Sequence, residues 1–208
     1  MKQASPDPYC YPGTHILRNL KDIRDSTALE AFEAAMVAIR LVRLSEGPLH
    51  GPFDLHRLCE THRRIFDGVY DWAGQLRRNT GTMTKQREAG NVISYGDSVY
   101  VEPALSKVFA ELAWEMQLKG LPANRFALRA AFYYGEIDAI HPFREGNSRT
   151  LRKFFGDLAE EAGYKIDWTS ASRTEEQRRQ IFLARDLAVM RGDPSLLASI
   201  IAHHLHSV

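Results

Sequence analysis

Hydrophobic residues recur at steps of three and four along most of this chain, the spacing that places side chains on one face of an α-helix. Ser26 or Thr27 can cap the first stripe and Asn124 the fourth, because short polar side chains accept hydrogen bonds from the free amides of a helix start. The stripes predict helices over residues 27–46, 54–66, 103–119, 124–140, 147–162, 174–191 and 194–206.

Two segments break this helical pattern. One is punctuated by glycines, and its short β-prone pieces at 80–84 and 92–95 flank a polar tip, which predicts a β-hairpin within residues 79–96. The other, residues 1–27, is rich in Pro, Tyr and Gly, which predicts an irregular arm packed against the domain. We therefore expect a single all-α domain over residues 1–208 with one small hairpin.

Composition narrows the possible functions. The 208 residues are 44% hydrophobic, which suffices for a packed core, and 27 basic residues stand against 26 acidic ones. A net charge of +1 gives no global attraction to nucleic acid or an anionic membrane, so we expect no direct binding to either. Two cysteines, no apolar leader and no apolar run long enough to span a membrane favour a soluble, cytoplasmic protein.

One nonapeptide combines the elements of a phosphate site. Residues 141–149 read His-Pro-Phe-Arg-Glu-Gly-Asn-Ser-Arg, which predicts a helix end, a proline break, a turn and a new helix start. The first amides of a helix lack internal partners and lie at the positive end of its dipole, so Gly146, Asn147 and Ser148 are expected to form an anion cradle. Gly146 would also let the chain approach a ligand closely.

The side chains around this cradle have distinct expected roles. Arg149 and Arg152 are three residues apart on one helix face, where both guanidinium groups can reach phosphate oxygens. Glu145 is a nearby carboxylate that can hold Mg²⁺ together with nucleotide phosphates. His141, with an ordinary pKa of about 6.5, is the candidate general base, and Phe143 is expected to anchor the loop in the core.

The spacing His-Pro-Phe-x-Glu-Gly-Asn-x-Arg-x-x-Arg over residues 141–152 resembles the signature of Fic domains. Residues 7–13, 71–77 and 162–168 extend the resemblance to the bacterial Fic toxins of toxin–antitoxin pairs and to related secreted effectors. The resemblance implies a helical Fic fold and an adenylyltransferase that moves AMP from ATP to a hydroxyl side chain of another protein.

The resemblance also implies a role for each site residue. His141 would deprotonate the target hydroxyl, which attacks the α-phosphate of ATP as pyrophosphate leaves. Arg149 and Arg152 would hold the outer phosphates, and Glu145 would hold Mg²⁺. Backbone donors of the Gly-Asn-Ser turn would complete the nucleotide site.

The hairpin and residue 148 add two further expectations. The resemblance makes the hairpin a flap that aligns the target backbone like an added strand, with Ile93 touching the nucleotide or the target. Ser148 departs from the family pattern, which has Gly or, in some branches, Lys at this place. Its hydroxyl could itself donate to a phosphate.

Partners follow from the same resemblance. Many Fic proteins are silenced by a Ser/Thr-x-x-x-Glu-Gly/Asn helix, whose glutamate blocks the outer-phosphate arginine. Ser26 to Glu30 has this spacing but is followed by Ala31, so we expect a small separate antitoxin that supplies the glutamate. DNA gyrase and topoisomerase IV are the expected targets of a toxin, and host proteins those of an effector translocated into a host cell.

Other readings of the signature stay open. The same fold could transfer another nucleotide or phosphate moiety, such as UMP or GMP. It could also be a Fic-like binding protein with weak catalysis, for which Ser148 is the suspicious feature. A helical DNA-binding module is disfavoured by the charge balance, since such proteins bind phosphate backbones through excess Lys and Arg.

Overall fold

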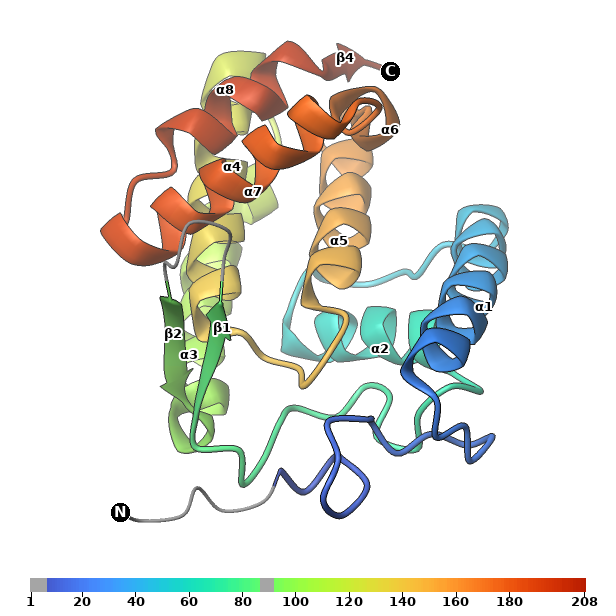
Figure 1. Ribbon diagram of the computed structural model, residues 1–208. Coiled ribbons are helices and arrows are strands. Elements are labelled where there is room, and N and C mark those ends of the chain that lie inside the picture. The colour runs from blue at the N-terminus through green and yellow to red at the C-terminus, as the bar shows by residue number, and fades with distance from the viewer. Residues whose placement is uncertain (1–6, 87–91) are drawn as a thin grey trace.

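The computed structural model describes residues 7–86 and 92–208 of the chain. Figure 1 shows a bundle of helices with a hairpin at one side, which confirms the expected all-α class. The helices are α1 (Ser26–Glu46), α2 (Leu55–Phe66), α3 (Val101–Trp114), α4 (Ala123–Ile140), α5 (Asn147–Glu161), α6 (Trp168–Ala171), α7 (Glu175–Arg191) and α8 (Ser195–His203), with single 3-10 turns η2 (Ser98–Tyr100) and η3 (Met116–Leu118). The strands are β1 (Thr82–Gln86), β2 (Val92–Asp97), β3 (Tyr164–Ile166) and β4 (Leu205–Ser207).

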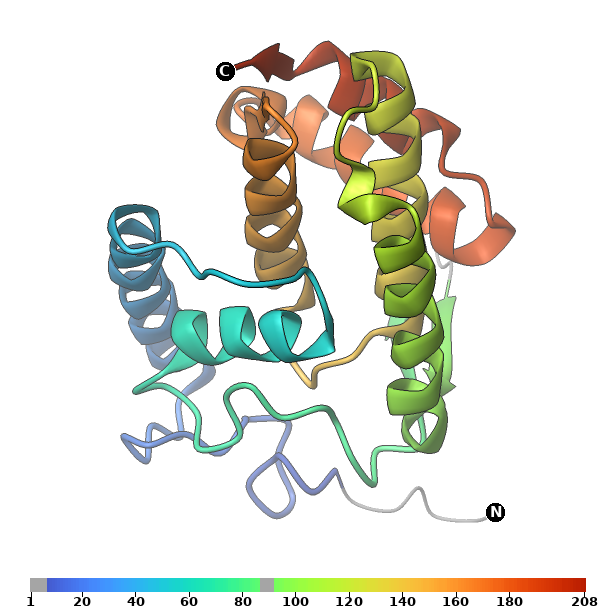
Figure 2. The same cartoon turned by 180° about the vertical axis from the view of Figure 1, so that it is seen from behind.

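The main core forms around α4, which packs against α3, α5, α7 and α8. Helix α2 contacts α5 from the other side, and Figure 2 shows it running across the lower end of α5. Phe126, Tyr134, Phe154 and Phe155 are among the core side chains and are fully buried. These residues belong to the stripes spaced at three and four, so the stripes do face a shared core as predicted.

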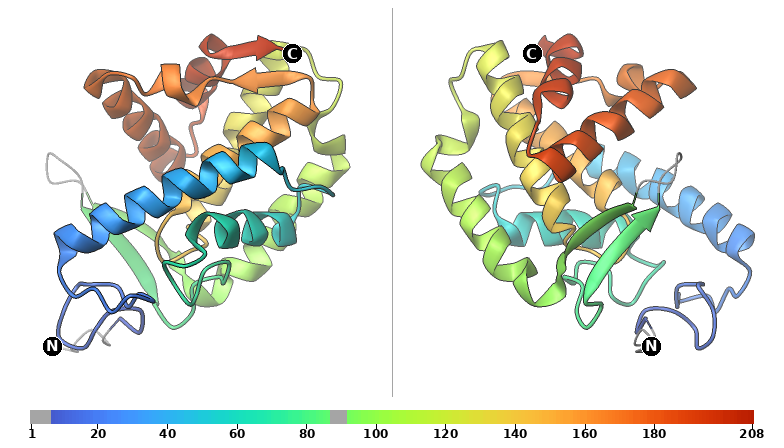
Figure 3. Two further views of the ribbon diagram at one scale, coloured as in Figure 1. Left: turned by 90° about the vertical axis from the view of Figure 1, so that its right-hand side faces the viewer. Right: turned by 60° about the vertical axis from the view of Figure 1, so that its left-hand side comes forward.

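A second, smaller core joins α1 and α2 to the N-terminal arm. Leu17 of the arm is buried with Leu29 of α1 and Phe66 of α2. Tyr9 packs edge-on against Trp72, with 5.4 Å between ring centroids. Figure 3 shows α1 running past α2 with the arm at its N-terminal end. From residue 7 to α1 the arm contains no helix or named strand and packs against the domain, and residues 1–6 lie outside the described part of the chain.

The N-termini of two helices differ from the expectation. Asp25, rather than Ser26 or Thr27, caps α1 by accepting a hydrogen bond from a first-turn amide. Asn124 does not cap α4, which begins one residue earlier, directly after Pro122. Proline has no amide hydrogen, so it fits at a helix start where that hydrogen would have no partner.

Helix α3 ends at Trp114, earlier than the expected residue 119. The following turn has left-handed backbone conformations at Met116, Gln117 and Leu118, with φ of 50°, 54° and 61°. This turn brings Leu118 into the main core, where it is fully buried, while Trp114 and Met116 stay exposed. Burial of one leucine therefore accompanies the loss of the last helical turn.

The C-terminus also differs from the expected helix through residue 206. Helix α8 ends at His203, and β4 pairs antiparallel with β3, with Ile166 opposite Leu205. Helix α6 and both of these strands were not expected. A strand of three residues is too short to show an alternating pattern of hydrophobic and polar side chains. Its pairing rests on backbone hydrogen bonds, which leave no mark on the sequence.

The predicted hairpin is confirmed for its described strands. β1 and β2 pair antiparallel, with Thr84 opposite Ser94. β1 is largely exposed, whereas β2 buries Ile93 and Tyr95 and contacts α4 and α7. The tip, residues 87–91, lies outside the described part of the chain. The hairpin thus rests on the bundle through β2 and leaves β1 at its free edge.

Candidate active site

The loop between α4 and α5 is closed by its own side chains. His141 ends α4 in the left-handed conformation, with φ of 52°, which turns the chain out of the helix. The Asn147 side chain accepts a hydrogen bond from the Phe143 amide at 2.9 Å and donates one to the Phe143 carbonyl at 2.8 Å. Asn147 is buried, so its side chain stabilises the loop and its main-chain amide is the group it can offer to a ligand.

Position 146 requires glycine for two reasons, its backbone conformation and the closeness of the Phe66 ring. Its φ of +81° lies in the region that favours glycine. A Cβ at this position would lie 2.2 Å from two carbons of the Phe66 ring. The space beside Gly146 is therefore filled by Phe66 of α2, whereas the sequence suggested that it was left open for a ligand.

His62 supports this loop from α2, a role that the sequence did not reveal. Its Nδ1 accepts a hydrogen bond from the Gly74 amide at 2.8 Å, so its Nε2 carries the proton and donates to the Glu145 carbonyl at 3.1 Å. The ring also stacks on Phe143, which is fully buried as expected, with centroids 3.9 Å apart. Burial lowers the pKa of His62 to about 3, so the ring is neutral at neutral pH.

The first amides of α5 lie where the anion cradle is expected. Thr150 donates to the Gly146 carbonyl at 3.0 Å and is the first amide to close a helical turn. The amides of Asn147, Ser148 and Arg149 precede that turn, at the positive end of the helix dipole. Such a group of amides is suited to binding phosphate oxygens.

The Ser148 side chain contacts a buried ion pair. Its Oγ accepts a hydrogen bond from Arg185 Nη1 at 3.0 Å, and Arg185 forms two further bonds of 2.8 Å to the Asp138 carboxylate. Both charged residues are buried. The hydroxyl oxygen therefore links α5 to α7, and because it accepts in this bond its own hydrogen stays a donor, so the expectation that it donates to a phosphate remains a prediction.

The two arginines of the signature differ in their surroundings. Arg149 Nη1 lies 2.6 Å from a Glu33 oxygen on α1, and its Nη2 lies 3.3 Å from Glu145 Oε1. The guanidinium also lies over the Phe66 ring. Within residues 7–86 and 92–208, Arg152 forms no ion pair, and its buried Nε has no hydrogen-bond partner. Arg152 is therefore the arginine that is ready to bind an anion.

Glu145 combines with this cradle in a way that fits a bound Mg²⁺. Its Oε1 accepts a hydrogen bond from the Gly146 amide at 2.8 Å, which places the carboxylate at the start of α5. Within the described part of the chain, no three His, Cys, Asp or Glu side chains are grouped to hold a metal alone. A cation here would need phosphate oxygens as further ligands, which is how Mg²⁺ is commonly bound beside nucleotides.

His141 lies between the hairpin and the bundle. Its ring stacks on Tyr95 of β2, with centroids 3.7 Å apart, and its Nδ1 is buried without a hydrogen-bond partner among the described residues. Burial lowers the pKa of His141 to about 4; the Asp138 carboxylate opposes this shift and Arg185 adds to it. The ring is therefore neutral at neutral pH, but its pKa is lower than the ordinary value expected from the sequence.

Ile93 does not line an open site. Its side chain is 1% exposed and belongs to the buried face of β2. Its neighbours Val92 and Ser94 are exposed, as is Gly96. Contact between Ile93 and a nucleotide or target would therefore require the hairpin to shift, and the sequence-based expectation gains no support.

Comparison with known proteins identifies the family. The family model described as "Fic/DOC family" matches residues 52–158, which include the whole loop and its supports on α2. This chain belongs to the Fic/DOC family. The Fic/DOC segment thus contains His62, the cradle and His141, the groups that the geometry brings together.

Several curated proteins are similar to this Fic/DOC chain. Protein adenylyltransferase VbhT of Bartonella schoenbuchensis is 36% identical over 203 residues, which are 98% of this chain and 40% of that protein. Probable protein adenylyltransferase y4lH of Sinorhizobium fredii is 37% identical over 197 residues, 94% of each chain. The chain therefore spans less than half of VbhT but nearly all of y4lH.

Solved structures share the fold. The BepC protein of Bartonella tribocorum, a VirB-translocated effector with bound AMPPNP, aligns with a TM-score of 0.82 at 24% identity, covering 96% of this chain and 97% of that one. An N-terminal Fic domain from Bartonella quintana with bound ADP aligns with a TM-score of 0.82 at 26% identity, covering 96% and 94%.

Proposed function

We propose that this Fic/DOC protein is a protein adenylyltransferase, which moves AMP from ATP to a hydroxyl side chain of another protein. The observation that carries the proposal is the loop itself, with the neutral His141 at one end and the amides of α5 at the other. Curated relatives at 36% and 37% identity are named protein adenylyltransferases. The AMPPNP and ADP bound by neighbours of the same fold support a nucleotide as the substrate.

Each residue of the loop has its own role in the proposed reaction. His141 accepts the proton of the target hydroxyl, whose oxygen bonds to the α-phosphorus of ATP as the bond to pyrophosphate breaks. The α5 amides and Arg152 bind phosphate oxygens and stabilise the charge on them. Glu145 would hold Mg²⁺, which neutralises phosphate charge when it is bound.

The target protein would dock along the hairpin. β1 is the exposed strand, and its outer edge can pair with an extended peptide as an added strand. Beside it lies a groove of about 400 Å³ lined by Asp7, Arg144 and residues 79–84. Family resemblance suggests DNA gyrase or topoisomerase IV as the target if the protein is a toxin, and host proteins if it is an effector.

A small separate antitoxin would regulate this site. Glu33 of the same chain forms an ion pair with Arg149, while Arg152 is unpaired among the described residues. A glutamate supplied by a partner could pair with Arg152 and exclude the outer phosphates of ATP. The regulatory proposal therefore depends on the difference between the two arginines.

The reaction would take place in the cytoplasm, of the producing cell for a toxin or of a host cell for an effector. No helix in the described part of the chain is long and apolar enough to cross a membrane. Solved neighbours include effectors described as VirB-translocated.

Labelling of a cell lysate tests the proposed activity. With α-labelled ATP we expect label on a protein band, whereas γ-labelled ATP should leave none, because pyrophosphate departs. His141→Ala should reduce the labelling rate by about 10²–10⁴-fold, the usual contribution of a general base. His56→Ala, which changes an exposed histidine of α2, should label normally.

Several outcomes would contradict this proposal. Label from γ-labelled ATP would indicate phosphate transfer, and stronger label from α-labelled UTP or GTP would indicate another nucleotide. Equal labelling by wild type and His141→Ala would exclude His141 as the base. Mass spectrometry of the labelled band identifies the added group and the modified residue.

A further inference from the structure

Arg77 is an unusual residue for the interior of this protein. It is 1% exposed and is among the largest fully buried side chains. Within residues 7–86 and 92–208 it forms no ion pair, so no carboxylate contacts its charge directly. A buried guanidinium is costly unless its donors are satisfied, so the arrangement of its acceptors indicates what it stabilises.

Its acceptors belong to two separate parts of the molecule. On the hairpin side, Nη1 donates to Thr80 Oγ1 at 2.9 Å and to the Gly81 carbonyl at 3.0 Å, and Nη2 donates to the Gly96 carbonyl. On the catalytic side, Nε donates to the His141 carbonyl at 2.6 Å and Nη2 to the Ile140 carbonyl at 3.2 Å. One side chain therefore bonds to both ends of the hairpin and to the last carbonyls of α4.

The helix carbonyls that accept from Arg77 explain how its buried positive charge is tolerated. The last carbonyls of a helix have no intrahelical donors and lie at the negative end of its dipole. Arg77 satisfies two of them at the residues that lead into the catalytic loop. Its own amide donates to the Pro142 carbonyl at 2.8 Å, which fixes the next residue as well.

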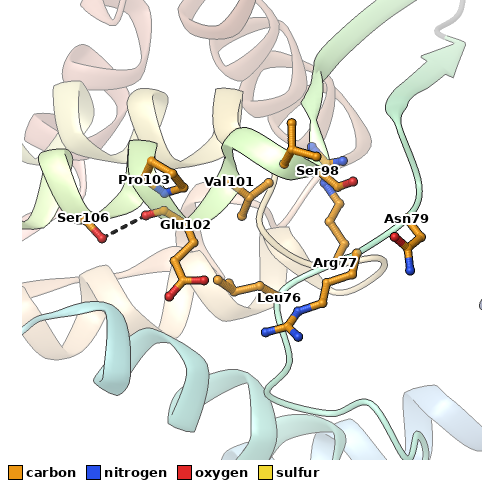
Figure 4. A pocket seen from close by; sticks show the side chains of 10 residues that line it. Leu76, Arg77, Asn79, Ser98, Val101, Glu102, Pro103 and Ser106 are labelled. Carbon is orange, nitrogen blue, oxygen red and sulfur yellow. Dashed lines mark hydrogen bonds between the residues drawn. The ribbon is translucent and has the colours of Figure 1, made fainter.

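The base of the hairpin borders a cleft on one side. A cleft of about 600 Å³ opens beside it, between residues 76–79 and the start of α3, and Figure 4 shows the side chains that line it. The hairpin therefore rests on the bundle through the buried face of β2, where Tyr95 stacks on His141. Gly96, directly after Tyr95, is one of the acceptors of Arg77.

We propose that Arg77 is a positioning residue that fixes the docking strand β1 relative to the His141 ring. This inference rests on the proposed function, in which the target lies along β1 and gives its proton to His141. Reacting groups must be held close to attack geometry, and a misplacement of about 1 Å can reduce a rate by about 10²-fold. The planar fork of arginine supplies five donors in fixed directions, which lysine does not.

The test compares Arg77→Gln and Arg77→Lys with Arg57→Gln. Arg57 is also buried and bonds a carbonyl, that of Gly51, but its other partner is Glu161 at the far end of α5. Hydrogen exchange of the amides in 82–86 and 92–97 should accelerate about tenfold in Arg77→Gln and stay unchanged in Arg57→Gln. This readout does not depend on catalysis.

Two functional measurements complete the experiment. The rate of lysate labelling with α-labelled ATP should fall about 10²-fold in Arg77→Gln and less in Arg77→Lys, while the Kd for MgATP stays within about threefold, because the cradle lies on α5. Thr80→Val removes a single acceptor and should produce a smaller change in the same direction, which keeps the test available if Arg77→Gln does not fold.

The outcomes separate this inference from the proposed function. If wild type labels nothing, the proposed function fails, and the exchange data still decide whether Arg77 holds the hairpin. Unchanged hairpin exchange in the Arg77 variants would overturn the inference. Exchange that accelerates equally throughout the α4–α5 core, with weaker MgATP binding, would show a general stabilising role and would also overturn it.

Discussion

The two sides of the active-site loop differ in how completely their polar groups are paired. On the side of α1 and α2, His62 uses both ring nitrogens and Arg149 contacts two carboxylates. On the side of α4 and the outer turns of α5, His141 Nδ1 and Arg152 Nε are buried without partners among the described residues. Buried polar atoms without partners cost free energy, which a ligand that bonds to His141 and Arg152 would recover. Within the described part of the chain, Arg40 Nε, Arg57 Nε and Trp72 Nε1 also lack partners, but none of them belongs to residues 141–152.

The comparison assigns different tasks to residues of one motif. Gly146, Asn147 and Arg149 lie on the paired side and shape the loop, whereas His141 and Arg152 remain available for chemistry. Substitutions on the paired side should therefore reduce stability, and substitutions on the unpaired side should reduce nucleotide binding or catalysis.

The largest expected effect is on the paired side, at Gly146. Gly146→Ala combines the cost of a left-handed alanine with a collision against Phe66, about 2–5 kcal/mol in total. Gly163→Ala is the matched control, since Gly163 has φ of +86° and nothing within 4 Å of an added Cβ. Its cost should be about 1–2 kcal/mol. Urea unfolding measures both, and equal losses would show that the Phe66 contact is unimportant.

On the unpaired side, we expect Arg152→Ala to weaken MgATP binding by about 10–100-fold. Charge-assisted hydrogen bonds contribute about 1.5–3 kcal/mol each, and Arg152 is unpaired before the nucleotide binds. Arg149→Ala should weaken binding less, because Arg149 already contacts Glu33 and Glu145. Calorimetric titration with MgATP measures both affinities. A larger loss in Arg149→Ala than in Arg152→Ala would reverse the assignment.

Sequence alone predicted most of the fold because the helical stripes are long. Stripes such as the one from Leu151 to Ala159 extend over several turns, and local spacing determines which face is buried. The errors lie where short-range details decide the outcome. The cap of α1 is Asp25, one position before the expected Ser26. The strands β3 and β4, which the sequence did not predict, have only three residues each.

The candidate site differs from the fold in what the sequence reveals. The groups proposed to bind phosphate lie within one loop and the helix that follows, so their spacing is visible in the sequence. The groups that hold the loop come from distant segments, since Arg77 and His141 are 64 positions apart and Arg185 and Ser148 are 37 apart. No local pattern connects such residues, and only the packing of α2, α4, α5 and α7 brings them to the loop.

The last expected effect is a dependence on pH and compares the two histidines across the loop. Burial lowers the pKa of His62 to about 3 and that of His141 to about 4. Both pKa values lie below the value of about 6.5 for an unfolded histidine. At pH values between the folded and the unfolded pKa, the unfolded state therefore binds more protons than the folded state. The free energy of unfolding should be constant above pH 6.5 from this source and fall on acidification by about 1.4 kcal/mol per pH unit for each histidine.

Urea unfolding between pH 7 and 4.5 measures this slope. His141→Gln removes one of the two contributions, so its slope should be smaller than that of wild type by about 1.4 kcal/mol per pH unit. The labelling rate of the wild-type protein should stay the same at pH 5.5 and fall near pH 4, because His141 stays neutral down to that range. Loss of labelling near pH 6.5 would mean that His141 titrates as an exposed histidine and that the hairpin does not bury it.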